Sequence, residues 1–169
     1  MRLKTKKDVA QLRVSGRILA ETLKLIAKEC KPGVSLEYLD GLAHDYIKRK
    51  GAKPAFLGYK PAWADEVYPA AICTSLNEQI VHGIPSEYAV RDGDVIKLDL
   101  GVNYKGYFTD AAVTVAVGKV PARATRMIAA TNGTRIRPII QEAKKALSRD
   151  LSRKTVRKLT GALRRNFRS

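Results

Sequence analysis

Hydrophobic residues recur at helical spacing in the first third of the chain. Between Asp8 and Glu29, one apolar stripe is formed by Leu12, Leu19, Leu23 and Ile26. Pro32-Gly33 ends this pattern, and Ser35 then stands at an N-cap position. The next apolar stripe, which runs until Gly51, is formed by Leu39, Leu42, Ala43, Tyr46 and Ile47. The spacing predicts two amphipathic helices.

The pattern changes after Lys53. Up to Val67, glycine, proline and aromatic residues interrupt any period, which indicates a loop. Beyond it, short apolar runs between turn-forming residues predict strands at Ala70–Ser75, Gln79–His82, Val95–Val102 and Tyr107–Val117. Two helices followed by an antiparallel group of strands define an α+β fold.

Charge divides the chain near Val120. The 169 residues carry a net charge of +16, of which residues 1–120 contribute +4 and residues 121–169 contribute +12. We therefore expect two parts, residues 1–119 and an atypical basic tail over 120–169. A solvated or disordered extension is the first interpretation of such a tail, and an arm that binds RNA is the alternative.

The composition also indicates the compartment. A mean hydropathy of -0.23 and the lack of an apolar run of about 20 residues exclude a membrane-spanning helix. Two cysteines, Cys30 and Cys73, are too few for a disulfide framework or a four-cysteine zinc site. We expect a cytoplasmic protein with free thiols.

Two aspartates carry the strongest candidate chemistry. If Tyr104-Lys105 forms a two-residue hairpin loop, Asp99 and Asp110 lie directly opposite each other on one face of the sheet, where like charges repel. Two carboxylates in this position can bridge a pair of divalent metal ions. In the alternative, a bulge shifts the register and one aspartate faces solvent.

The segments around these aspartates resemble the central signature of the type I methionine aminopeptidases. The signature comprises the run Asn77-Glu-Gln-Ile-Val-His82-Gly-Ile-Pro85, then Lys97-Leu-Asp99, and finally Gly106-Tyr-Phe-Thr-Asp110. The resemblance covers about residues 1 to 119. It implies one half of the pita-bread fold, a cytoplasmic hydrolase, and removal of the initiator methionine from nascent chains by two-metal hydrolysis.

The resemblance also implies roles for individual residues. Asp99 and Asp110 correspond to two of the five metal ligands of the family, and the metals could be manganese, iron, cobalt or zinc. His82 corresponds to the catalytic histidine that hydrogen-bonds the substrate. The methionine pocket is matched by Phe56, Tyr59 and Cys73, although Phe56 stands where family members often have a smaller residue. For each of these side chains, a purely structural role is the alternative.

The second half of the expected site has no counterpart in the sequence. In the family a histidine and two glutamates complete the metal shell, but after Asp110 this chain has no histidine and one glutamate, Glu142. We therefore expect a truncated or frame-shifted aminopeptidase without activity. The alternative is a non-catalytic protein that keeps half of the fold and contacts RNA or the ribosome through its basic tail.

Overall fold

The structure is a computed structural model that describes residues 5–60, 62 and 65–130. By its internal contacts the chain divides between Thr125 and Arg126. Most of the basic tail, and with it the RNA contact considered for it, lies outside the described residues. No helix in the described part is long and apolar enough to cross a membrane.

The two predicted helices are present. Helix α1 spans Lys6–Glu29, two residues longer at its start than predicted, because Thr5 caps it and forms a capping box with Asp8. Helix α2 spans Leu36–Arg49, and the Ser35 hydroxyl accepts a hydrogen bond from the Tyr38 N–H at 3.1 Å.

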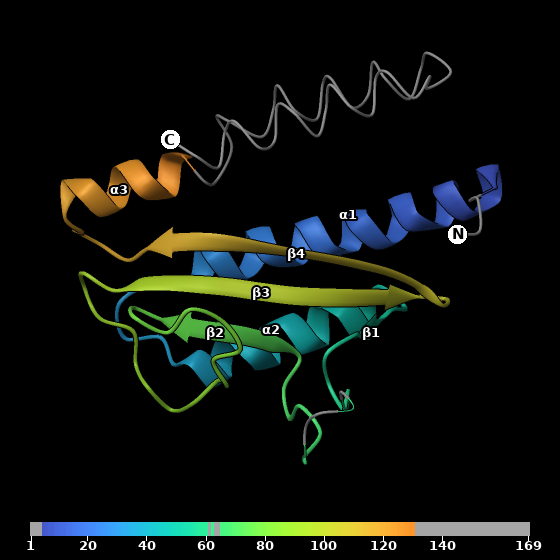
Figure 1. The fold of residues 1–169 in the computed structure, drawn as a ribbon, viewed down its shortest axis with the longest axis horizontal. Coiled ribbons are helices and arrows are strands. Elements are labelled where there is room, and N and C mark those ends of the chain that lie inside the picture. The colour runs from blue at the N-terminus through green and yellow to red at the C-terminus, as the bar shows by residue number, and fades with distance from the viewer. Residues whose placement is uncertain (1–4, 61, 63–64, 131–169) are drawn as a thin grey trace. The chain divides into compact units, whose positions relative to one another are not determined.

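Four antiparallel strands form one sheet. They are β1 (Lys53–Pro54), β2 (Ile72–Leu76), β3 (Val95–Tyr104) and β4 (Tyr107–Ala116). Strand β3 pairs with β4 along one edge and with β1 and β2 along the other. Both helices lie on one face of the sheet, and the prediction of an α+β fold is confirmed (Figure 1). A further helix, α3, spans Ala122–Ala129.

The core lies between this face of the sheet and the two helices. Its centre is made of alternate residues of β3, all fully buried: Ile96, Leu98, Leu100 and Val102. Side chains of α1 and α2 complete it, among them Leu23, Ile26, Leu39 and Ile47. Because side chains alternate along a strand, the residues between them face the opposite side.

The prediction of a strand at Gln79–His82 is wrong. The chain turns at Asn77-Glu78, and the Lys97 ammonium group donates hydrogen bonds to the carbonyls of Asn77 and Gln79. These side-chain bonds occupy carbonyls that a strand ladder would use. The apolar Ile80 and Val81, which suggested a strand, are 82% and 60% exposed.

The loop predicted from Lys53 to Val67 begins with a short strand instead. Lys53 and Pro54 form β1, opposite Asn103 and Val102 of β3. Two residues are too few to give a periodic signal, and proline is tolerated because this strand lies at the sheet edge. The rest of the segment is irregular where it is described.

The hairpin between β3 and β4 differs from the predicted one by a single position. Its loop is Lys105-Gly106, not Tyr104-Lys105, and Tyr104 pairs with Tyr107. Lys105 and Gly106 have φ values of 52° and 86°. Positive φ at both central residues defines the type I′ turn, whose twist suits a two-residue hairpin.

This hairpin generates a stability prediction. Gly106→Ala should lower the free energy of unfolding by about 1 kcal/mol, because a Cβ disfavours the left-handed backbone. Gly41→Ala is the matched control: Gly41 lies within α2 with open space around it, so alanine should raise stability by about 0.5 to 1 kcal/mol. Urea denaturation measures both, and equal stabilisation by the two substitutions would contradict the observed turn.

Candidate functional site

A cavity of about 850 Å³ opens on the face of the sheet opposite to the helices. Its walls come from residues 55–59 and 66–69, from β2, from residues 82–84 and from the β3–β4 hairpin. Every site residue expected from the sequence lines it: Phe56, Tyr59, Cys73, His82, Asp99 and Asp110. The fold thus brings four separate segments to one place.

The two aspartates lie on the same face but not directly opposite each other. Asp99 pairs with Ala112, and Asp110 pairs with Gly101, so the predicted direct pairing is wrong. The cause is the one-residue displacement of the hairpin loop. The aspartates are instead diagonal neighbours, which remain within reach of each other across a sheet.

Burial and like charge perturb this pair. Burial in the cavity, followed by the charge of Asp110 and the hydrogen bond between the two carboxyls, raises the pKa of Asp99 from 3.8 to about 6. His82 acts in the opposite direction. The Asp99 carboxyl therefore ionises in this site only at a cost, which is the condition under which a bound cation is favoured.

Gly101 makes room for the pocket wall above β3. A Cβ at this position would lie 2.9 Å from both the Ala55 Cβ and the Phe56 Cε1 atoms. The Ala55 N–H also donates to the Gly101 carbonyl at 2.9 Å. The absence of a side chain at Gly101 thus lets the loop place the Phe56 ring beside Asp99 in the cavity.

The position of His82 is fixed by the contacts that the next residue, Gly83, makes with β2. Gly83 packs so closely on β2 that a Cβ would collide with the Thr74 carbonyl oxygen. The Thr74 N–H donates to the Gly83 carbonyl at 2.7 Å, and the Gly83 N–H donates to the Ser75 hydroxyl at 3.1 Å. His82 itself is exposed, with a φ of 58°, so its imidazole remains accessible to a ligand.

Cys73 lies at the floor of the cavity, opposite Asp99 across β2 and β3. Its exposed fraction is 4%, and burial raises the pKa of its thiol. Tyr68 stands beside it and donates to the carbonyls of Ile72 and Gly83, at 3.0 and 3.2 Å. The Tyr68 ring also makes an edge contact with Phe56, with centroids 6.4 Å apart.

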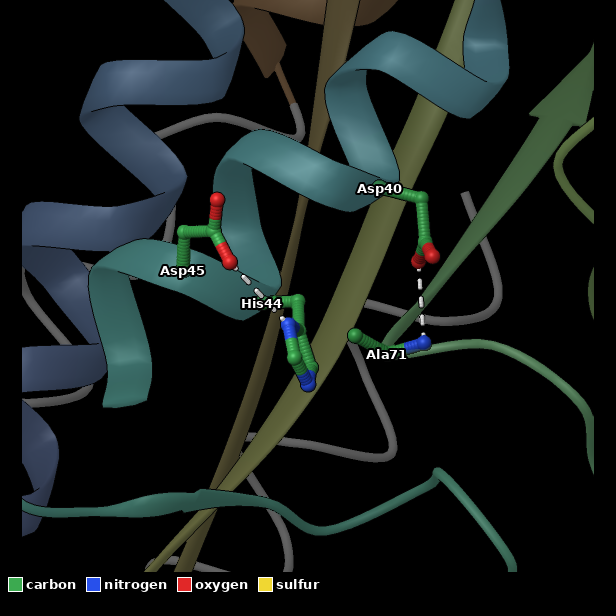
Figure 2. A network of polar contacts seen from close by, with 4 residues as sticks. All are labelled: Asp40, His44, Asp45 and Ala71. Atoms are coloured by element: carbon green, nitrogen blue, oxygen red, sulfur yellow. Dashed lines mark hydrogen bonds and ion pairs between the residues drawn. The ribbon is translucent and has the colours of Figure 1, made fainter. Parts of the chain in front are cut away.

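Helix α2 anchors the start of β2 (Figure 2). One carboxylate oxygen of Asp40 accepts hydrogen bonds from the Ala71 and Ile72 N–H groups, at 2.9 and 3.0 Å. Burial raises the pKa of Asp40, and these two bonds oppose the rise. His44 is turned to Asp45 at 3.3 Å, in keeping with the surface role that its position suggests.

Asp40 and Tyr68 were missed by the sequence analysis. Asp40 could have been noticed, because it lies among the apolar positions of α2, where a carboxylate needs a partner. Nothing in the sequence around Tyr68 distinguishes it from the other aromatic residues of its loop.

The metal-ligating side chains at this site supply only part of the ligands that a two-metal centre needs. Asp99 and Asp110 are oxygen ligands of the kind that hard and borderline divalent ions accept. Within residues 5–60, 62 and 65–130, however, no three His, Cys, Asp or Glu side chains come together in a way that could hold a metal ion. These residues do not complete a coordination shell.

Comparison with known proteins agrees with this architecture. The sequence profile of metallopeptidase family M24 matches residues 10–157. The chain therefore belongs to metallopeptidase family M24. The match continues past Val120, where the charge composition changes.

Within that family, the chain is similar to methionine aminopeptidases. The one from Aquifex aeolicus is 42% identical over 130 residues, which are 76% of this chain and 50% of that protein. The crystal structure of the Rickettsia prowazekii enzyme matches with a TM-score of 0.72 and 34% identity, over 78% of this chain and 51% of that one. The Thermotoga maritima structure matches with a TM-score of 0.73 and 30% identity, over 85% and 53%.

The chain thus spans about half the length of the relatives that it matches. The expected resemblance to methionine aminopeptidases and the half pita-bread fold are both confirmed.

The raised pKa of Asp99 generates a prediction about pH. A carboxyl whose pKa is higher in the folded than in the unfolded state lowers stability as pH rises from about 4 to 6. Asp99 is only partly buried, so with solvent screening the cost above pH 6 is on the order of 1 kcal/mol. Asp99→Asn should therefore raise the free energy of unfolding at pH 7.5, by up to that amount, and should have little effect at pH 3.5.

Asp65→Asn is the control, because Asp65 is an exposed loop residue. Its effect should be small at both pH values. Denaturant unfolding of the metal-free chain measures the difference, and a destabilised Asp99→Asn variant at pH 7.5 would show that Asp99 is not a strained carboxylate.

Proposed function

We propose that the chain supplies the methionine pocket and two metal-ligating carboxylates of an aminopeptidase that removes the initiator methionine from nascent proteins. One observation carries this proposal: all six site residues expected from the sequence line a single cavity. Membership of metallopeptidase family M24 supports the reaction class. The similarity to methionine aminopeptidases supports the substrate.

The chemistry of the pocket suits an N-terminal methionine. Phe56, Tyr59 and Cys73 offer aromatic rings and a thiol, and a thioether packs well against aromatic rings and polarizable sulfur. In the metal-free chain, the N-terminal ammonium group of the substrate would lie towards Asp99 and Asp110, whose mutual repulsion a cation relieves. The pocket would thus select both an unbranched apolar side chain and a free amino terminus.

His82 has the position of a substrate-orienting group. It lies at the rim of the cavity, exposed, on a segment that Gly83 fixes to β2. A neutral imidazole can donate one hydrogen bond and accept another, so it could hold the peptide bond that follows the methionine. When bound, a divalent metal pair would polarise the scissile carbonyl and activate a water molecule.

The number of ligands limits what the chain can do alone. Asp99 and Asp110 are two of the ligands that the reaction requires, and the sequence after Asp110 contains no histidine and only one glutamate. Two carboxylates do not hold a metal pair in the geometry needed to generate a nucleophilic water at neutral pH. We infer that the 169-residue chain alone binds its substrate but does not cleave it.

An activity assay tests this limit. The purified chain should release no methionine from a Met-Ala peptide above the level of a blank, with manganese, iron, cobalt or zinc added in turn. The Asp99→Ala variant serves as the matched control for contaminating activity. Metal-dependent release by the parent chain that disappears in Asp99→Ala would contradict the inference.

Binding without cleavage is tested through the two thiols. Cys73 lines the cavity, whereas Cys30 is buried in the core with a pKa raised by burial to about 11. A Met-Ala-Ala peptide, at about twice its Kd, should slow alkylation of Cys73 about threefold. An Asp-Ala-Ala peptide should not, and Cys30 should be unaffected by either.

Peptide mapping by mass spectrometry measures both rates in the same sample. Equal protection by the two peptides, or protection of Cys30 alone, would count against a methionine pocket.

A further inference from the structure

Helix α1 carries a straight row of cations on its outer face. The row, called here the α1 basic row, consists of Lys6, Arg13, Arg17, Lys24 and Lys28, all exposed. Their spacing alternates between seven and four residues, which are close to two turns and one turn of an α-helix, so the five side chains project along one line. At 1.5 Å per residue the row is about 33 Å long.

The charge of Arg17 acts on Glu21, one turn further along α1, but the close contacts of the carboxylates of this helix are made with other groups. Each of its three carboxylates has a partner outside the row: Tyr107 bonds Asp8 at 2.8 Å, Lys50 pairs with Glu21 at 3.0 Å, and Lys31 pairs with Glu29 at 3.5 Å. In the described part of the chain, no member of the row forms an ion pair.

Like charges four residues apart, as in Arg13–Arg17 and Lys24–Lys28, destabilise a helix. The row therefore has the character of a surface that an anionic partner would neutralise.

We propose that the α1 basic row binds the phosphate backbone of an RNA duplex. The α-helix holds the five charges in a line, which complements the regularly spaced negative charges of a stiff duplex. The row contains no aromatic residue to stack on bases, so the contact is independent of sequence. The choice of RNA rests on the proposed function, since nascent chains emerge from the ribosome, whose surface is largely RNA.

A membrane surface is a less suitable partner for this face of α1 than RNA is. Interfacial helices bury large apolar side chains beside their cations. The exposed apolar neighbours of the row are two valines and two alanines, Val9, Ala10, Val14 and Ala20, which are too small to insert deeply. The large apolar residues of α1, such as Leu23 and Ile26, are buried in the core.

The proposal is tested by measuring the affinity of the full chain for RNA at several salt concentrations. All variants keep the basic tail, so a difference in affinity reports on the replaced cations. The row variant replaces all five cations by glutamine. The matched control removes the same charge from scattered exposed positions by replacing Lys48, Lys53, Lys60, Arg91 and Lys119 with glutamine. Each protein is titrated with a fluorescent RNA duplex of about 20 base pairs at several salt concentrations, and circular dichroism confirms that each is folded.

The affinity of the row variant for RNA should be about tenfold lower at about 100 mM salt. The decrease of log K with log salt should become less steep, by about 3 units of slope. The scattered variant should stay within about twofold of the parent chain. Arg13→Lys with Arg17→Lys, which keeps the charge, should also bind like the parent. If the row variant does not fold, a double variant replaces it. Lys24→Gln combined with Lys28→Gln should lower the affinity for RNA in part, whereas Lys48→Gln combined with Lys53→Gln should not.

Equal losses in the row and scattered variants would overturn the proposal, as would an unchanged row variant. Row-dependent binding to vesicles of anionic lipid without binding to RNA would overturn it as well. The titrations contain neither peptide nor metal, so their failure would leave the proposed aminopeptidase site untouched, and failure of the thiol-protection experiment would leave the RNA contact untouched.

Discussion

The alternation of side chains along β3 is the constraint on which the rest of the structure depends. Ile96, Leu98, Leu100 and Val102 point to the helices and are fully buried, while Asp99 and Gly101 face the cavity. Because β3 is hydrogen-bonded along both edges, this strand cannot slip without breaking its pairing on both sides. A slip by one residue would place a carboxylate in the core, so the same packing that stabilises the fold fixes Asp99 in the site.

Each wall of the cavity is then attached to this sheet by backbone contacts. The loop that carries Phe56 is bonded to Gly101 of β3, and the segment that carries His82 is bonded to Thr74 of β2. The floor at Cys73 is secured from behind by Asp40 of α2. The site therefore consists of loops on a rigid scaffold, an arrangement typical of binding sites. The unfavourable electrostatic energy of the site comes from the two aspartates, because no described residue fully neutralises their repulsion.

Much of this architecture could be predicted from the sequence, for identifiable reasons. Both helices have a clear apolar period and good N-caps at Thr5 and Ser35, and the hairpin strands are long. The register follows from Gly106: a two-residue hairpin loop needs positive φ at both residues, which Lys105-Gly106 accepts more readily than Tyr104-Lys105. The pairing of Asp99 with Asp110 neglects this preference. The apolar residues of Gln79–His82 are typical of a strand, but here the Lys97 side chain bonds the Gln79 carbonyl in place of a neighbouring strand.

The resemblance to a known family predicts which residues form the site, but it does not predict their geometry. Spacing alone suggested that Asp99 and Asp110 face each other, but they are diagonal and still close. The most direct measurement of this arrangement is a ¹³C NMR titration of the aspartate side chains in the metal-free chain. Asp99 should titrate near pH 6, and Asp110→Asn should shift that midpoint towards 4. A midpoint near 4 for Asp99 in the parent chain, unchanged by Asp110→Asn, would show that the two carboxylates do not share a site.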